Sequence, residues 1–244
     1  MSAPIVVFSN CQTCPVRNEN TFCNLPGDAL IQIERVKKYK TFAPGTRLFD
    51  EGQPVDELMI VCKGSVTLAF SNLHGRPAML GLSERGEVLG ISSAVSGHPH
   101  EVSADAVGEV RVAAISLTDF RRLQNRFPSI ATAASEELSR KVNRAYDTIR
   151  LVGSGLSVPQ RLAGWLLRMQ DRHPDQPGRV TIALTHERIS QLLGASRESV
   201  TRALSQFKRH GAVEVRGIHV YLLDHRYLKS LSYSSEPFTA KRPT

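Results

Sequence analysis

The sequence predicts an α+β chain with an N-terminal antiparallel β-domain, a long helix, and a basic C-terminal domain that ends in a small hairpin. Short alternating segments divided by glycine turns over residues 41–116 indicate the β-domain. An unbroken helical pattern after Pro128 indicates the long helix, and two short amphipathic helices joined at Gly194 indicate the C-terminal domain. With 244 residues, the chain is long enough for two domains that each bury a core.

The N-terminal part divides into a lead segment and the β-domain. Residues 1–27 are polar and hold three cysteines, and residues 28–40 alternate apolar with charged side chains, which predicts one short helix. Glycine turns then recur at the spacing typical of a sandwich or barrel-like β-domain. The expected strands span residues 46–49, 57–62, 65–70, 78–82 and 110–115.

The long helix is expected from Pro128 to about Val152. Its apolar residues step by four and three, which is the spacing of a heptad seam. This seam could pack on the β-domain or pair with the same helix of a second copy. Its members are Leu138, Val142, Ala145, Ile149 and Val152. Residues 153–155, Gly-Ser-Gly, end the helix and form the expected hinge.

The C-terminal domain is expected to begin with an amphipathic helix over residues 156–172, a proline-rich loop at 173–178 and a short strand at 180–184. Two helices that cross steeply follow, because Gly194 permits a tight turn between them and Ser196 is a natural N-cap. Their apolar positions have helical spacing, and one polar face remains on the second helix. That face holds Arg197, Glu198, Thr201 and Arg202.

This pattern is typical of a helix-turn-helix that presents long donors and acceptors to base edges in a DNA major groove. The alternative is a plain helical hairpin with a solvated charged face. Residues 212–223 favour the first interpretation, because they form two alternating runs that turn at Arg216 and Gly217, as the wing of a winged helix-turn-helix would. Since DNA readers commonly pair half-sites, the seam on the long helix is expected to form a homodimer.

Charge is divided unequally along the chain. Of the net charge of +8, residues 1–155 carry +1, from 17 basic and 16 acidic side chains. Residues 156–244 carry +7, from 14 basic and 7 acidic side chains. The positive field therefore belongs to the part with the helix-turn-helix, as phosphate binding requires. The short apolar run at residues 5–8 excludes a signal peptide or a membrane span, so a cytoplasmic location without membrane attachment is expected.

With a β-domain, a long helix and a winged helix-turn-helix in this order, the chain resembles the CRP/FNR family of bacterial transcription regulators over residues 28–230. The most specific segments are GTRLFDEG at 45–52, VCKGSV at 61–66, GEVLG at 86–90 and SRESVTR at 196–202. The resemblance implies a cyclic-nucleotide-binding-like β-roll that senses an effector, a dimerisation helix, and a winged helix-turn-helix on a palindromic operator. It also aligns residues 173–179 with a surface that meets RNA polymerase in some activators.

The resemblance assigns roles to individual residues. Arg197, Glu198 and Arg202 fall on base-reading positions, where arginine suits guanine and glutamate suits the cytosine amino group. The residues expected to hold the DNA backbone are Thr185, Ser196, Ser199 and Thr201, and Thr201 also adds a methyl and a hydroxyl to the reading face.

The effector site departs from the cyclic-nucleotide pattern. Where that pattern has Gly-Glu-Leu and Arg-Ser, this chain has Gly90, Ile91 and Ser92, and then His100 and Glu101. A glutamate would repel a cyclic phosphate, and the usual arginine is missing. A cyclic nucleotide is therefore disfavoured as the effector, although a cyclic-nucleotide-responsive regulator without metal remains the alternative.

The lead segment is the other candidate sensor. Cys11, Cys14 and Cys23 resemble the N-terminal cysteine group of oxygen-sensing members, which hold an iron–sulfur cluster. In a reducing cytoplasm, cysteines are expected to be thiols, metal ligands or cluster ligands rather than disulfides. Eight residues separate Cys14 from Cys23, which is more than in the usual pattern, and the fourth family cysteine should fall near Ala113. Cys62 could replace it if the lead segment folds back over the β-roll. The other interpretations are a zinc site with three cysteines and a histidine, redox-active thiols without metal, and inert core thiols.

The expected domains are the lead segment (1–27), the β-roll (28–127), the dimerisation helix (128–153), the winged helix-turn-helix (154–230) and a disordered tail (231–244). Two other classes of protein fit less well. An enzyme is disfavoured because the chain has no phosphate-cradling glycine loop and no nucleophile motif, so no catalytic residue is assigned. A cyclic-nucleotide module acting only through protein partners would not need the basic reading face.

Overall fold

A computed structural model describes residues 10–15, 17, 21–71, 77–153, 155–172, 177–181, 184–217 and 219–232. The chain forms two compact units, Met1–Ala145 and Tyr146–Thr244. Ser154 of the expected hinge, residues 173–176 of the proline-rich loop, and residues 233–244 of the expected tail lie outside the described residues. Within the described part, no helix has the length and apolar character to cross a membrane.

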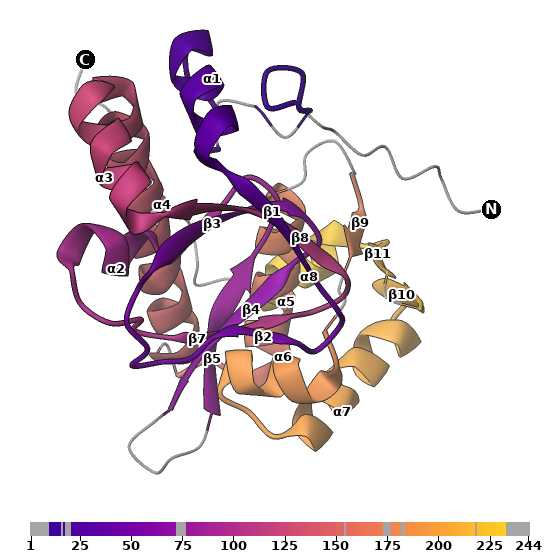
Figure 1. The fold of residues 1–244 in the computed structure, drawn as a ribbon. Coiled ribbons are helices and arrows are strands. Elements are labelled where there is room, and N and C mark those ends of the chain that lie inside the picture. The colour runs from indigo at the N-terminus through magenta and orange to yellow at the C-terminus, as the bar shows by residue number, and fades with distance from the viewer. Residues whose placement is uncertain are drawn as a thin grey trace, which may run out of the picture. The chain divides into compact units, whose positions relative to one another are not determined.

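The first unit contains two antiparallel four-stranded sheets, as expected for a β-roll (Figure 1). One sheet has the order β1-β8-β3-β6, with β1 at Lys38–Phe42, β8 at Val110–Ser116, β3 at Glu57–Lys63 and β6 at Val88–Leu89. The other has the order β2-β7-β4-β5, with β2 at Arg47–Phe49, β7 at Ser103–Ala106, β4 at Val66–Ser71 and β5 at Pro77–Ser83.

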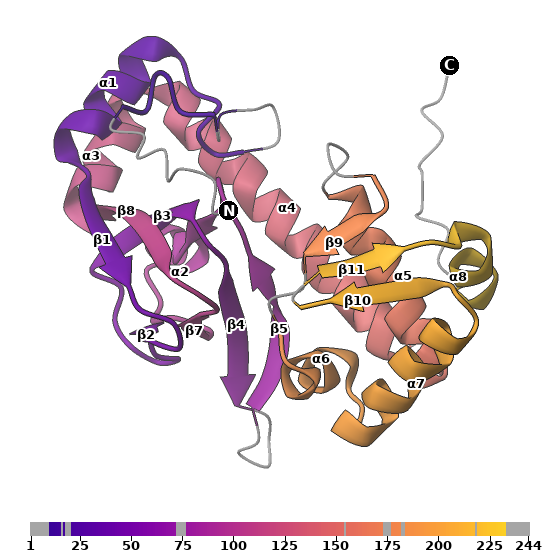
Figure 2. The same ribbon diagram turned by 90° about the vertical axis from the view of Figure 1, so that its right-hand side faces the viewer.

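Strands β3 and β8 are buried on both faces. One face of each packs inside the roll in a core that includes Phe49, Val61 and Val112. The opposite face packs on the helices around the roll, which are α1 (Gly27–Val36), α3 (Leu117–Arg126) and the start of α4 (Pro128–Gly153). Figure 2 shows α1 and α3 together beside the sheet that contains β8 and β3. This second core contains Phe22, Leu30, Ile60, Phe120 and Ile130.

The structure corrects the expected helix at residues 28–40. Helix α1 ends at Val36, Lys37 is extended, and β1 begins at Lys38. The segment after Lys37 pairs with β8 in a continuous antiparallel register, with Lys38 opposite Ala114 and Phe42 opposite Val110. Pairing with a distant strand therefore decides this boundary. Helices α2 (Ile91–Ser96), α3 and α8 (His225–Leu231) were not predicted.

The second unit contains the last turns of α4, followed by α5 (Val158–Asp171), α6 (His186–Leu193), α7 (Arg197–Arg209) and α8. Its sheet has the order β10-β11-β9, with β9 at Arg179–Thr181, β10 at Val213–Arg216 and β11 at His219–Leu222. The hairpin expected at residues 212–223 is β10–β11, and Figure 2 shows it after α7. The core includes Leu162, Trp165, Leu193, Phe207 and Leu228.

His100 is a buried polar residue of the β-roll, with 6% of its surface exposed. Its ring stacks on Phe49 with centroids 3.9 Å apart. A Cβ added at Gly90 would lie 3.0 Å from the imidazole Cε1, so a larger residue there would press on the ring. Burial lowers the pKa of His100, and this effect outweighs the opposing influence of the carboxylates of Glu101 and Asp56.

Acidification is expected to destabilise the β-roll through His100. The folded domain lowers the pKa of the imidazole, whereas the unfolded chain protonates it at the ordinary pKa near 6.5. The urea midpoint of the first unit should therefore fall as the pH drops from about 7.5 to about 5.5, and His100→Gln should reduce that fall. His98→Gln, at an exposed histidine two residues away, is the matched control and should keep the wild-type dependence. An unchanged pH dependence in His100→Gln would contradict this assignment.

Candidate nucleic-acid interface and cysteine centre

Helix α7 has one buried and one exposed face. Val200, Ala203, Leu204 and Phe207 are buried at helical spacing. Since the helix repeats every 3.6 residues, the side chains between these positions must point away from the core. The exposed residues include Arg197, Glu198, Thr201 and Arg202, which are the four expected on the reading face.

The turn between α6 and α7 has the local geometry that the sequence predicted. Gly194 is in the left-handed region with φ of 58°, and the N–H of Ala195 donates to the carbonyl of Ser190. A Cβ at Gly194 would lie 3.2 Å from Cγ1 of Val152, near the end of α4, so this turn packs closely on that helix. Arg161 of α5 also donates to the Gly194 carbonyl, at 3.4 Å.

The hydroxyls expected to hold the DNA backbone also organise the helix ends. Thr185 accepts from the N–H of Arg188 and caps α6, and Ser196 accepts from the N–H of Ser199 and caps α7. Ser196 also donates to the Ser199 hydroxyl at 3.0 Å. The guanidinium of Arg202 donates to that same hydroxyl at 3.3 Å. A short chain of hydrogen bonds therefore orients Arg202 from the start of its own helix.

His186 joins this face from α6, and it was not predicted as a site residue. Its Nδ1 lies 2.9 Å from the hydroxyl of Thr201 on α7. That hydroxyl also donates to the carbonyl of Arg197, at 3.0 Å. His186 lies directly after the α6 N-cap, so its place in the sequence indicated only the beginning of a helix.

The reading face combines cations with a charged carboxylate. A hydrogen bond from its own backbone N–H lowers the pKa of Glu198, and the neighbouring guanidinium groups of Arg197 and Arg202 lower it further. Glu198 is therefore an ionised acceptor between two permanent donors. Arginine and carboxylate side chains at such spacing can address both partners of a G·C pair.

The seam on α4 is divided between the core and the surface. Leu138 packs against the first unit's core, whereas Val142, Ile149 and Val152 are exposed. Tyr146, which was not predicted, is also exposed, at 55%. Exposed apolar residues at steps of four and three form a stripe along the second half of the helix.

The four cysteines are free thiols, each partly buried. Cys11, Cys23 and Cys62 pack on the same hydrophobic core between the β-roll and its helices, so the lead segment folds back on the roll. Among the described residues, no three side chains of the His, Cys, Asp and Glu types lie in positions that could hold a metal ion. Cys11, Cys23 and Cys62 thus lie in one region, but among the described residues their thiols are not arranged as the ligands of a metal ion.

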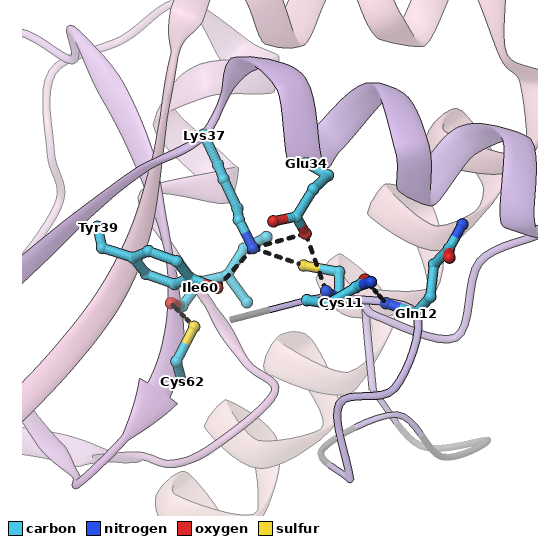
Figure 3. A network of polar contacts seen from close by, with 8 residues as sticks. Cys11, Gln12, Glu34, Lys37, Tyr39, Ile60 and Cys62 are labelled. Carbon is cyan, nitrogen blue, oxygen red and sulfur yellow. Dashed lines mark hydrogen bonds and ion pairs between the residues drawn. The ribbon is translucent and has the colours of Figure 1, made fainter. Parts of the chain in front are cut away.

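Lys37 links the lead segment to this region (Figure 3). Its side chain is 3% exposed, and its ammonium donates to the Cys11 sulfur at 3.0 Å, to Glu34 at 2.8 Å and to Tyr39 at 2.5 Å. The backbone N–H of Cys11 donates to the same Glu34 carboxylate, at 2.8 Å. Burial alone lowers the pKa of Lys37, but these bonds outweigh the burial and raise it overall.

Burial raises the pKa values of the inner thiols. It raises that of Cys62 to about 11, with smaller contributions from Cys11 and Cys14. It also raises that of Cys23, where Cys11, Cys62 and Cys14 all contribute. These contributions agree with the packing, which places Cys11, Cys23 and Cys62 on one core. Cys62 also interacts with the backbone of Ala113 on β8, near which the resemblance would place a fourth cysteine.

The two departures from the cyclic-nucleotide pattern interact with each other. The Ser92 hydroxyl donates to the Glu101 carboxylate at 2.7 Å. His100, at the position of the usual arginine, is buried against Phe49 and Gly90. At the positions where the resemblance would have placed phosphate contacts, the side chains of the β-roll therefore bond to or pack against other residues of the roll.

Two family models match the chain. Residues 39–127 match the cyclic nucleotide-binding domain, and residues 160–231 match the Crp-like helix-turn-helix domain. Together they cover the β-roll and the described helix-turn-helix, including its wing.

Several regulators are similar over most of their length. The CRP-like cAMP-activated global transcriptional regulator of Mycobacterium tuberculosis is 32% identical over 191 residues, 77% of this chain and 84% of that protein. The nitrogen fixation regulation protein FixK of Bradyrhizobium diazoefficiens is 26% identical, covering 91% and 93%. The fumarate and nitrate reduction regulatory protein of Escherichia coli is 22% identical, covering 91% and 90%.

A solved structure of a related regulator has a similar fold. The solved structure of FixK2 from Bradyrhizobium japonicum superposes with a TM-score of 0.74 at 22% identity, covering 82% of this chain and 99% of that one. These relatives confirm the expectation of a transcription regulator rather than an enzyme. With both domain types matched and a 32% identical regulator covered over most of its length, the chain belongs to the CRP/FNR family of transcription regulators.

Proposed function

We propose that the protein binds a palindromic operator in double-stranded DNA as a homodimer, with RNA polymerase as its partner. We also propose that this binding is controlled by the cysteine centre, which consists of Cys11, Cys14, Cys23 and Cys62. The observation that carries the proposal is the exposed face of α7, where two arginines and an ionised glutamate stand opposite a buried apolar stripe. The excess of positive charge in residues 156–244 supports binding to phosphates.

Base reading is assigned to Arg197, Glu198 and Arg202. A guanidinium can donate twice to the O6 and N7 atoms of guanine, and a carboxylate can accept from the cytosine amino group. Thr185, Ser196 and Ser199 are assigned to the DNA backbone, since they lie at the N-termini of α6 and α7, where dipoles and free N–H groups favour phosphate.

Arg202→Ala is expected to cost about 1–3 kcal/mol of binding free energy on the preferred operator while sparing binding to random duplex. The operator is first selected from a random-sequence library, and affinities are then measured by fluorescence anisotropy. Arg226→Ala is the matched control, because it removes the same charge from the exposed surface of α8. Equal losses on selected and random duplexes would contradict a base-reading role for Arg202.

The homodimer is assigned to the exposed stripe on α4. Val142, Tyr146, Ile149 and Val152 would leave a contiguous apolar surface in water if the chain stayed alone. Pairing the same helix about a two-fold axis buries this surface in a coiled-coil seam. It also sets two copies of α7 at the fixed separation that a palindrome requires.

Ile149→Glu should convert the dimer to monomer, because it places a charge in the middle of the seam at a residue that is 64% exposed in the single chain. Sedimentation velocity measures the change. Arg150→Glu is the control, because Arg150 is the neighbouring exposed residue outside the apolar stripe, where it pairs with Asp147. A dimer of undiminished affinity in Ile149→Glu would locate the interface elsewhere.

The cysteine centre is assigned to an iron–sulfur cluster held by Cys11, Cys14, Cys23 and Cys62. The chemistry of the donor set fits, because all four thiols are free and three of them, Cys11, Cys23 and Cys62, pack on one apolar core. Ligation requires the thiols to close in, and it displaces Cys11 from Lys37. When bound, a cluster supplies sensitivity to oxygen or redox state, and its loss would return the lead segment to the contacts of Lys37 and Glu34.

The fourth ligand offers a specific test. Cys62→Ser should reduce the iron and acid-labile sulfide of the anaerobically purified protein, whereas the double variant Cys62→Ser, Ala113→Cys should restore them. The reason is that β3 and β8 are adjacent, and the Cys62 side chain interacts with the Ala113 backbone. Ala114→Cys in the Cys62→Ser background is the control, because Ala114 lies in the core inside the roll and should not restore iron. Full iron content in Cys62→Ser alone would exclude Cys62 as a ligand.

A cyclic nucleotide is the second candidate effector, favoured by the match to the cyclic nucleotide-binding domain and by the cAMP-activated relative. The hydrogen bond that Ser92 donates to Glu101 and the burial of His100 weigh against a cyclic nucleotide. Isothermal titration of the purified protein with cyclic AMP distinguishes the two effectors.

A further inference from the structure

The hydroxyl of Thr201 is engaged in hydrogen bonds within the protein. The hydroxyl lies 3.0 Å from the Arg197 carbonyl and 2.9 Å from Nδ1 of His186. The hydroxyl donates its single proton to the Arg197 carbonyl, which can only accept. With the hydroxyl proton directed to Arg197, the tautomer assigned to His186 carries its proton on Nδ1 and donates it to the Thr201 oxygen.

This arrangement leaves Thr201 without a polar donor for DNA. Acceptors on base edges in the major groove, such as O4 of thymine and O6 or N7 of guanine, need a donor that the hydroxyl no longer has. The methyl group of Thr201 remains, on an exposed residue between Arg197 and Arg202 on the reading face. A side-chain methyl in the major groove makes its specific contact with the 5-methyl group of thymine.

We propose that Thr201 reads a thymine in each half-site through its methyl group, and that His186 is the positioning residue that holds Thr201 in the orientation to do so. This inference rests on the proposed reading of DNA by α7. It places Thr201 with the base readers rather than with the backbone contacts, and it makes α6 a contributor to sequence preference through His186.

The probe is an operator in which deoxyuridine replaces each thymine in turn, symmetrically in both half-sites, because uracil lacks only the 5-methyl group. Burial of one methyl group contributes about 0.8 kcal/mol, which corresponds to about a four-fold change in affinity per half-site. The full-length protein should therefore bind one of the substituted operators about sixteen-fold more weakly than the thymine operator, since two half-sites change together.

Three variants of Thr201 and His186 separate the groups involved. Thr201→Ser retains the hydroxyl and removes the methyl, so the ratio of thymine to deoxyuridine affinity should fall to about one. Thr201→Val retains a methyl and removes the hydroxyl, so the ratio should persist. His186→Ala should lower the ratio, because it removes the donor that holds Thr201.

His186→Asn should restore the ratio, because its Nδ2 can donate from nearly the same position as Nδ1 of the imidazole. A general loss of phosphate contact cannot imitate these results, since it weakens binding to both operators equally and leaves the ratio unchanged. The ratio is therefore the readout for all four variants.

Equal affinity for thymine and deoxyuridine operators at every position would overturn the inference while leaving operator binding intact. A ratio lost in Thr201→Val would show that the hydroxyl reads the base, and a ratio kept in His186→Ala would remove His186 from the arrangement. Failure to select any preferred operator from the random library would instead refute the proposed function itself.

Discussion

Burial of one face of α7 is the constraint on which the reading surface depends. Because Val200, Leu204 and Phe207 must stay in the core, the helix cannot rotate about its axis without exposing apolar area. The orientation of Arg197 and Arg202 toward solvent is therefore a consequence of hydrophobic packing on the other side. The hydrogen bonds of Ser196 and Ser199 refine a direction that the core has already set.

Features governed by local spacing could be predicted from the sequence, and those governed by distant pairing could not. The apolar steps of α6 and α7, the glycine between them and the β10–β11 hairpin all follow from residues close in the chain. The boundary between α1 and β1 depends on pairing with β8, more than 70 residues away. His186 was missed for the same reason, since its bond to Thr201 joins two different helices.

The cysteine centre illustrates both limits. Spacing grouped Cys11, Cys14 and Cys23, whereas Cys62 could join them only if the lead segment folds back over the β-roll, which no pattern along the chain shows. Packing makes that connection, because Cys11 and Cys23 lie against the same hydrophobic core as Cys62. Contacts between segments far apart in the chain thus decide which thiols lie together, and spacing along the chain cannot show this.

The close approach of Gly194 to Val152 has a further consequence. The turn of the helix-turn-helix rests on the last turns of the same helix that carries the exposed apolar stripe. Any twist or bend in that terminal portion would be transmitted to the turn directly, without an intervening flexible joint. A residue with a Cβ at position 194 would accordingly push either the turn or the end of α4 out of place, because Cγ1 of Val152 would lie only 3.2 Å away.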